Sequence, residues 1–215
     1  WVYFDDENRK KSMIKAYFSL RKIFKNIKPN IVNTQLFDDS LPALLAAKHI
    51  GIKTRIITKS DTSFHHFYAP KGVKWDNFNK ANATHVVAIS SENKNFIQQF
   101  EKNWENKLQM IHHGIQTEIY RHPNFEYVKE FKEKWKLGNK FLVGTVSRFI
   151  EWKGYREIVK AAEIVIAEIP EICFLLIGHG PQKEEIKDLI KERKLEKYFC
   201  MPGYIQPVNM PSVYS

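Results

Sequence analysis

The sequence contains few cysteines and no long apolar run. Of its 215 residues only Cys173 and Cys200 are cysteines, without CxxC spacing, which favours a reduced intracellular protein over a disulfide scaffold and offers no cysteine-based metal site. No apolar stretch approaches the roughly 18 residues that a membrane span requires. The opening residues, WVYFDDENRK, have neither an initiator methionine nor the pattern of a signal peptide. We therefore expect a fragment that starts inside a domain.

Acidic residues are outnumbered by basic ones. The chain has 34 Lys and Arg against 24 Asp and Glu, a formal net charge of +10. Such an excess suits an anionic partner: a nucleotide, a polyphosphate, nucleic acid or an anionic membrane surface. The composition does not distinguish between these four kinds of partner. With 43% apolar residues the chain can bury the core of one or two domains.

Apolar runs alternate with helical periods along the whole chain, which is typical of parallel sheets covered by helices. The expected strands are 30–34, 54–60, 84–90, 107–114, 141–147, 172–178 and 198–203, and the expected helices are 12–29, 41–51, 91–100, 155–170 and 182–193. The segment 113–124 has mixed polarity and no period, so it is interpreted as a linker. The predicted fold class is α/β, with one parallel-sheet domain at 1–115 and a second at 116–215.

Two cations follow the predicted strand in FLVGTVSRFIEWKG, residues 141–154. Arg148 and Lys153 stand where this strand ends, and Gly154 opens the next helix. In doubly wound sheets, ligands bind outside the carboxyl ends of the strands, where helix N-termini favour anions. An Arg fork and a Lys point charge would suit a diphosphate. The alternative is a solvated basic loop.

Further motifs resemble a known family. A strand ending in Ser-Arg, then Lys-Gly, a helix, PEICFLLIGHGP, another helix and a strand ending in FCMPG follow one another over about 60 residues, in the order of that family's motifs G-R, K-G, P-x-x-x-L-x-I-x-G-x-G-P and F-x-G. The matching positions are Ser147, Arg148, Lys153, Gly154, Pro170, Gly178, Gly180, Pro181 and Gly203. This pattern resembles the nucleotide-sugar-binding domain of retaining glycosyltransferases of the GT-B fold, family 4 (glycosyl transferases group 1). HHGIQTEIY, residues 112–120, also resembles the family's segment leading into that domain, with His113 and Gln116 as departures.

The resemblance implies a GT-B architecture of two Rossmann-like, doubly wound domains, both incomplete here. It implies that Arg148 and Lys153 bind the donor diphosphate and offset the charge that develops on the leaving nucleoside diphosphate. The turn at Gly178 and Gly180 would let backbone approach a ligand closely, with a tight turn as the alternative. It implies no catalytic nucleophile that can be assigned, no cofactor beyond the nucleotide sugar, and no required metal.

Two departures from the family affect the rest of the site. The family's E-x7-E segment, which holds the ribose and the donor sugar, is expected beyond Ser215. In the first domain, residues 59–61 (Lys, Ser, Asp) replace a frequent histidine. Asp61, His65 and His66 begin a polar loop after a strand and are candidates for an acceptor cleft.

The predicted function is transfer of a sugar, with retention, from a nucleotide sugar to a glycan or lipid-linked acceptor in the cytoplasm, in surface polysaccharide biosynthesis. A basic nucleic-acid-binding module is one alternative, but no RRM, KH or helix-turn-helix signature is present, so no nucleic-acid partner is expected. Another nucleotide-binding α/β enzyme is disfavoured because no strand is followed by GxGxxG. The cluster RKIFKNIK, residues 21–28, is compatible with peripheral contact with an anionic membrane, and a solvated face over a buried stripe is its alternative.

Overall fold

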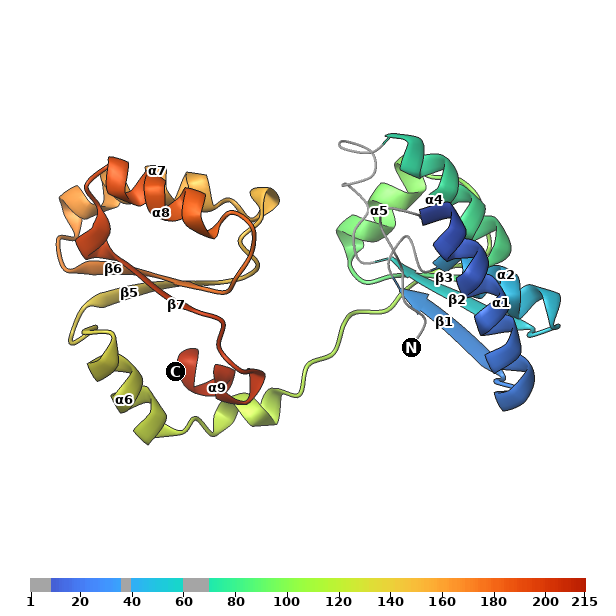
Figure 1. The fold of residues 1–215 in the computed structure, drawn as a ribbon, viewed down its shortest axis with the longest axis horizontal. Coiled ribbons are helices and arrows are strands. Elements are labelled where there is room, and N and C mark those ends of the chain that lie inside the picture. The colour runs from blue at the N-terminus through green and yellow to red at the C-terminus, as the bar shows by residue number, and fades with distance from the viewer. Residues whose placement is uncertain (1–8, 36–39, 60–69) are drawn as a thin grey trace. The chain divides into compact units, whose positions relative to one another are not determined.

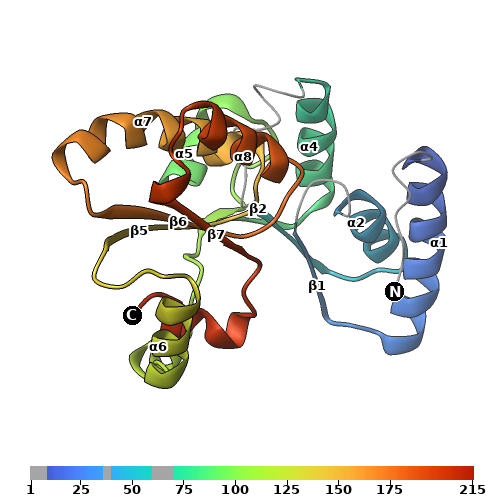
Figure 2. The same cartoon turned by 60° about the vertical axis from the view of Figure 1, so that its left-hand side comes forward.

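The chain forms two compact units, Trp1–Gly114 and Ile115–Ser215. The structure, a computed structural model, describes residues 9–35, 40–59 and 70–215 (Figures 1 and 2). Each unit has its own parallel sheet and its own buried core. The α/β class predicted from the sequence is confirmed in both units.

Unit 1 is built on a four-stranded parallel sheet whose spatial order follows the sequence. The strands are β1 (Ile31–Gln35), β2 (Thr54–Lys59), β3 (His85–Ala88) and β4 (Leu108–Met110). The helices are α1 (Arg9–Ile27), which precedes β1, and the crossover helices α2 (Ser40–His49), α4 (Pro70–Asn82) and α5 (Ser91–Phe100). Sheet and helices enclose an apolar cluster of Leu44, Ile57, Ala83, Val86, Ala88 and Ile97. Ser90 is the N-cap of α5, because its side chain accepts a hydrogen bond of 3.1 Å from the amide of Asn93.

Unit 2 has a three-stranded parallel sheet in the order β5, β6, β7. The strands are β5 (Phe141–Val146), β6 (Ile172–Ile177) and β7 (Phe199–Gly203). Helices α7 (Tyr155–Glu168) and α8 (Lys183–Glu192) cover one face, and α6 (Phe125–Lys134) and the short α9 (Met210–Val213) cover the other (Figure 1). All six residues of β6 are buried, as a strand covered on both faces requires. Alternate side chains of β6 therefore enter two separate cores.

The described residues also form four short 3-10 helices. They are η1 (Thr117–Arg121), η2 (Glu151–Lys153), η3 (Glu196–Tyr198) and η4 (Pro207–Asn209). η1 lies inside the segment 113–124 that was interpreted as a linker, and the boundary between the two units, at Gly114 and Ile115, falls in the same segment. Helices α4 and α6 were not predicted.

The two cysteines lie on neighbouring strands, within one core of unit 2. Both are free and buried. Burial raises the pKa of the Cys173 thiol, and it raises that of Cys200 to about 12. Both side chains therefore pack as neutral apolar groups.

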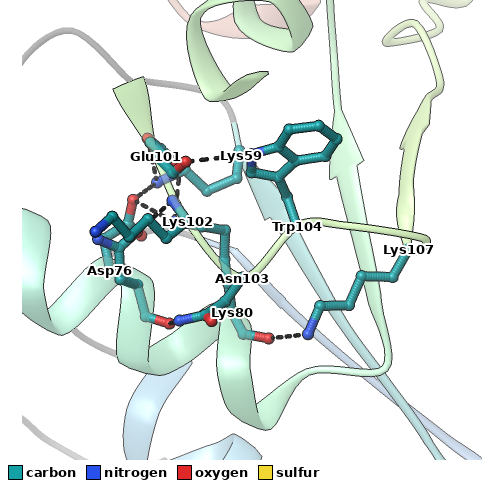
Figure 3. A network of polar contacts seen from close by, with 9 residues as sticks. Lys59, Asp76, Lys80, Glu101, Lys102, Asn103, Trp104 and Lys107 are labelled. Atoms are coloured by element: carbon teal, nitrogen blue, oxygen red, sulfur yellow. Dashed lines mark hydrogen bonds and ion pairs between the residues drawn. The ribbon is translucent and has the colours of Figure 1, made fainter. Parts of the chain in front are cut away.

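A network of four charged side chains is buried in unit 1 (Figure 3). Lys59 ends β2, Asp76 and Lys80 lie one turn apart on α4, and Glu101 follows α5; none is more than 5% exposed. The Lys80 Nζ lies 2.8 Å from Glu101 Oε2 and 3.4 Å from Asp76 Oδ2. The Lys59 Nζ pairs with Asp76 and lies 3.7 Å from Glu101 Oε1. Two cations thus neutralise two carboxylates where water cannot.

The segment after α5 is fastened to α4 around this network (Figure 3). The amide of Lys102 donates to Asn77 Oδ1, and Asn103 Nδ2 donates to the Asn77 carbonyl, both at 2.9 Å. Lys107 Nζ donates to the Lys80 carbonyl at 2.6 Å, near the C-terminus of α4. A cation at this helix end is favourable, because it meets the negative end of the helix dipole.

Unit 1 is expected to lose stability in acid through Asp76. Burial alone would raise the pKa of this carboxyl, but the charges of Lys59 and Lys80 outweigh burial and hold the pKa below its ordinary value of 3.8. Since the pKa is lower in the folded state than in the unfolded state, the stabilisation is present above the unfolded value and is lost as pH falls through the folded one. Urea unfolding from neutral down to about pH 3 would measure this loss.

The matched variant for this experiment is Asp76→Asn. It should unfold more easily at neutral pH, because a buried lysine loses its counter-charge, but its stability should change less in acid. Parallel acid profiles for the parent and the variant would contradict the role assigned to Asp76.

Candidate functional site

The candidate site lies at the carboxyl edge of the unit 2 sheet, where the loops after all three strands meet. The ladder continues beyond the strands: Ser147 N donates to Ile177 O at 3.1 Å, and Gly178 N donates to Gly203 O at 2.9 Å. Loops held in this way form a fixed rim at the end of a parallel sheet, which is the usual place for a ligand in doubly wound folds.

Arg148 is presented outward because both of its neighbours are anchored. Phe149 is fully buried and meets the ring of Tyr155 edge-to-face, with centroids 4.7 Å apart. On the other side, the hydroxyl groups of Ser147 and Tyr155 lie 2.9 Å apart, and Tyr155 also donates to the Ser147 carbonyl at 3.1 Å. Arg148 itself is exposed. The loop is thus rigid around a guanidinium that faces solvent.

Lys153 is exposed at the end of η2, in the same β5–α7 connection. Its amide bonds to the Ile150 carbonyl at 3.0 Å. Among the residues that the structure describes, neither Lys153 nor Arg148 forms an ion pair with a carboxylate. Both cations therefore have charge to offer an anion.

The connection ends at Gly154, the N-cap of α7. Gly154 has a left-handed backbone, with φ of 69°, and supplies no side-chain cap. The first amides of α7 are therefore open to an anion, which the helix dipole favours. Glu157, in the first turn of α7, competes for the same positive helix end.

Gly178 and Gly180 contact the Arg148 loop itself. A Cβ on Gly178 would lie 1.9 Å from the Ser147 carbonyl oxygen, and a Cβ on Gly180 would lie 2.4 Å from that of Phe149. The two loops are also bonded, because Phe149 N donates to His179 O at 2.9 Å. The glycines thus let two backbones approach each other, and their first role is to shape the loop that carries Arg148.

Sequence reasoning did not single out Tyr204 and treated His179 as incidental. The two exposed rings meet edge-to-face at the same rim, with centroids 5.5 Å apart. Tyr204 comes directly after the final glycine of β7, and this place after a strand end is the signal that could have drawn attention to it.

The candidate acceptor residues of unit 1 are not part of this rim. Asp61, His65 and His66 lie outside the described residues. Lys59 is the first of the three residues that stand where the resembled family frequently has a histidine. Its side chain forms ion pairs within the buried charge network.

Within residues 9–35, 40–59 and 70–215, no group of three or more His, Cys, Asp or Glu side chains could hold a metal ion. The expectation that no metal is required stays a prediction. No helix in that part of the chain combines the length and the apolar character needed to cross a bilayer.

Comparisons with known proteins support the family suggested by the motifs. Residues 128–215 match the family described as Glycosyl transferases group 1. An uncharacterised glycosyltransferase of Methanocaldococcus jannaschii is 29% identical over 187 residues, which are 81% of this chain and 45% of that protein. The matched family region contains every predicted donor-site residue of unit 2.

Solved structures show the same fold at low identity. The crystal structure of Anabaena HepE in complex with UDP and glucose has a TM-score of 0.76 at 16% identity, covering 94% of this chain and 53% of that chain. The UDP-GlcNAc 2-epimerase of M. jannaschii has a TM-score of 0.61 at 15% identity, covering 95% and 58%. The chain spans about half the length of these proteins.

Proposed function

We propose that the natural protein is a glycosyltransferase that moves a sugar from a nucleotide sugar to a glycan or lipid-linked acceptor. The observation that carries this proposal is the rim of the unit 2 sheet, where Arg148 and Lys153 stand exposed beside the open N-terminus of α7. The family match over 128–215 and the UDP in the HepE complex of similar fold support it.

The chemistry follows from the charge that develops during transfer. Breaking the bond between the sugar and the diphosphate leaves negative charge on the departing nucleoside diphosphate. Fixed cations and helix amides aimed at that charge stabilise the transition state more than the ground state. Arg148 would bind two phosphate oxygens with its fork, and Lys153 would add a point charge. We assign these two residues to leaving-group stabilisation and assign no nucleophile.

Several finer features belong to the same proposal. We expect transfer with retention, no cofactor beyond the nucleotide sugar, and nucleotide binding that survives a metal chelator. We also expect a cytoplasmic reaction, at the inner face of a membrane when the acceptor is lipid-linked, in the assembly of a surface polysaccharide. No nucleic-acid partner is expected.

The fold shared with an epimerase gives a second candidate function. An epimerase of the kind found among the similar structures acts on UDP-GlcNAc. Incubation with the nucleotide sugar and no acceptor separates the two chemistries. An epimerase would change the configuration of the sugar without an acceptor, whereas a transferase would leave the nucleotide sugar intact until an acceptor is added.

The donor site is tested with the Arg148→Ala, Lys153→Ala double variant. We expect one of UDP, GDP and ADP to bind the full-length natural protein in calorimetric titration. The variant should lose about 2 kcal/mol of binding free energy, roughly thirtyfold in Kd, because charge-assisted hydrogen bonds to the diphosphate are removed.

The matched control is Lys160→Ala, Lys191→Ala, which removes the same charge from exposed positions on α7 and α8. It should bind the nucleotide as the parent does. If no nucleotide binds, or if both double variants weaken binding equally, the rim cations are a solvated basic loop and the proposal fails.

A further inference from the structure

Helix α1 of unit 1 carries charge of one sign only. Between Arg9 and Ile27 it has seven Lys and Arg residues and no Asp or Glu, over 19 residues. At about 1.5 Å per residue the helix is about 28 Å long. Such a helix presents a positive surface far larger than a single ion-binding site.

One face of α1 is fixed to the rest of unit 1. Ala16 is buried, the Tyr17 hydroxyl hydrogen-bonds His49 Nδ1 of α2 at 2.7 Å, and Phe24 packs on the apolar cluster that contains Val32. Figure 1 shows α1 lying alongside α2. The rotation of α1 about its axis is therefore set by packing, and the same outer face is always presented.

The outer face combines apolar tips with cations. Ile14 and Phe18, one turn apart, are each 60% exposed. Exposed lysines lie three, four or seven positions from Phe18, which places them on the same side of the helix. They are Lys11, Lys15, Lys22 and Lys25. None of these four lysines pairs with a carboxylate in the part of the chain that the structure describes.

We propose that this outer face of α1 docks on an anionic lipid bilayer. Single exposed apolar residues are common, so Ile14 and Phe18 would mean little alone. Their position amid four cations matches a lipid surface, where lysines meet anionic headgroups while Ile and Phe enter the acyl boundary. A nucleic-acid backbone would satisfy the lysines but leave the apolar tips in water. The proposal goes beyond the nucleotide site, and it would bring a transferase to lipid-linked acceptors.

The test is flotation of the full-length natural protein with vesicles, without nucleotide. One set of vesicles is phosphatidylcholine alone, and the other mixes it with phosphatidylglycerol. Binding is expected only to the anionic vesicles and should weaken in high salt. Lys15→Gln, Lys22→Gln should lower the partition coefficient about thirtyfold. Ile14→Ser, Phe18→Ser should lower it at least about tenfold.

Matched variants on unit 2 control for net charge and for exposed apolar surface. Lys129→Gln, Lys160→Gln removes two exposed lysines, and Phe125→Ser removes an aromatic ring that is 74% exposed. Both should bind vesicles as the parent does. Circular dichroism melting should show that the α1 variants remain folded, as expected for exposed positions.

Three results would overturn the proposal. The first is no binding to anionic vesicles, and the second is an equal loss for the α1 and unit 2 variants. The third is binding to a single-stranded or duplex oligonucleotide that depends on Lys15 and Lys22 but not on Phe18, which would assign the face to nucleic acid. Because no nucleotide is added, none of these results bears on the donor site.

Discussion

Replacing Lys80 by alanine is expected to lower the free energy of unfolding of unit 1 by about 3–5 kcal/mol. The Lys80 side chain is completely buried and contacts both Glu101 and Asp76. Its removal leaves two buried carboxylates with Lys59 as their remaining cation in the network. The cost is that of a buried, uncompensated charge, which is much greater than the worth of an exposed ion pair. Urea unfolding followed by circular dichroism would measure it.

The controls for this prediction separate charge balance from helix propensity. Lys74→Ala, at an exposed position of the same helix, should cost less than about 0.5 kcal/mol. The double variant Lys80→Met, Glu101→Gln removes one charge of each sign, so it should be more stable than Lys80→Ala. A cost below about 1 kcal/mol for Lys80→Ala would show that water reaches this network.

Replacing Gly178 by alanine should destabilise unit 2 by about 3 kcal/mol and weaken nucleotide binding as well. The new Cβ would lie 1.9 Å from the Ser147 carbonyl oxygen, and Gly178 has a φ of 144°, which other residues rarely adopt. The Arg148 loop must move to relieve the contact. Thermal unfolding and nucleotide titration of the same sample would measure both effects.

Two other glycines provide graded controls. Gly138 has a positive φ of 51° but no atom near its missing Cβ, so Gly138→Ala should cost only the backbone strain, about 1 kcal/mol. Gly144 has neither a positive φ nor a close neighbour, and Gly144→Ala should be nearly neutral. If Gly178→Ala is no worse than Gly138→Ala, the backbone contact with the Arg148 loop does not constrain the site.

The strands of unit 2 and its helices α7 and α8 could be predicted from the sequence because their patterns are local. The buried run of β6 and the apolar face of α7, which includes Val159 and Ala162, follow the strand and helix periods directly. Strand ends then place Arg148 and Lys153 at the rim without further information.

Helix α4 could not be predicted because its polarity is reversed. Its buried positions include Asp76, Asn79 and Lys80, while Trp75 and Phe78 are about half exposed. A search for apolar periodicity finds no inward face in such a segment. The polar face is stable only because Lys59 and Glu101, distant in the sequence, complete the network.

The sequence predicts the cations of the site but not the backbone contacts that hold their loop in place. Nothing in the local sequence around Gly180 indicates that it lies against the backbone of Phe149, about 30 residues earlier. Such contacts depend on how neighbouring strands are paired. The motif could therefore name the residues of the rim but could not distinguish a turn that meets a ligand from one that meets another loop.

The strand β6 has a consequence for how the protein must be handled. Its six residues, ICFLLI, contain no charge, proline or glycine, and all are buried in the native unit. Short segments of this kind form intermolecular cross-β structure when they become exposed. Partial opening of unit 2 would therefore lead to aggregation that increases with protein concentration, and refolding should succeed best in dilute solution.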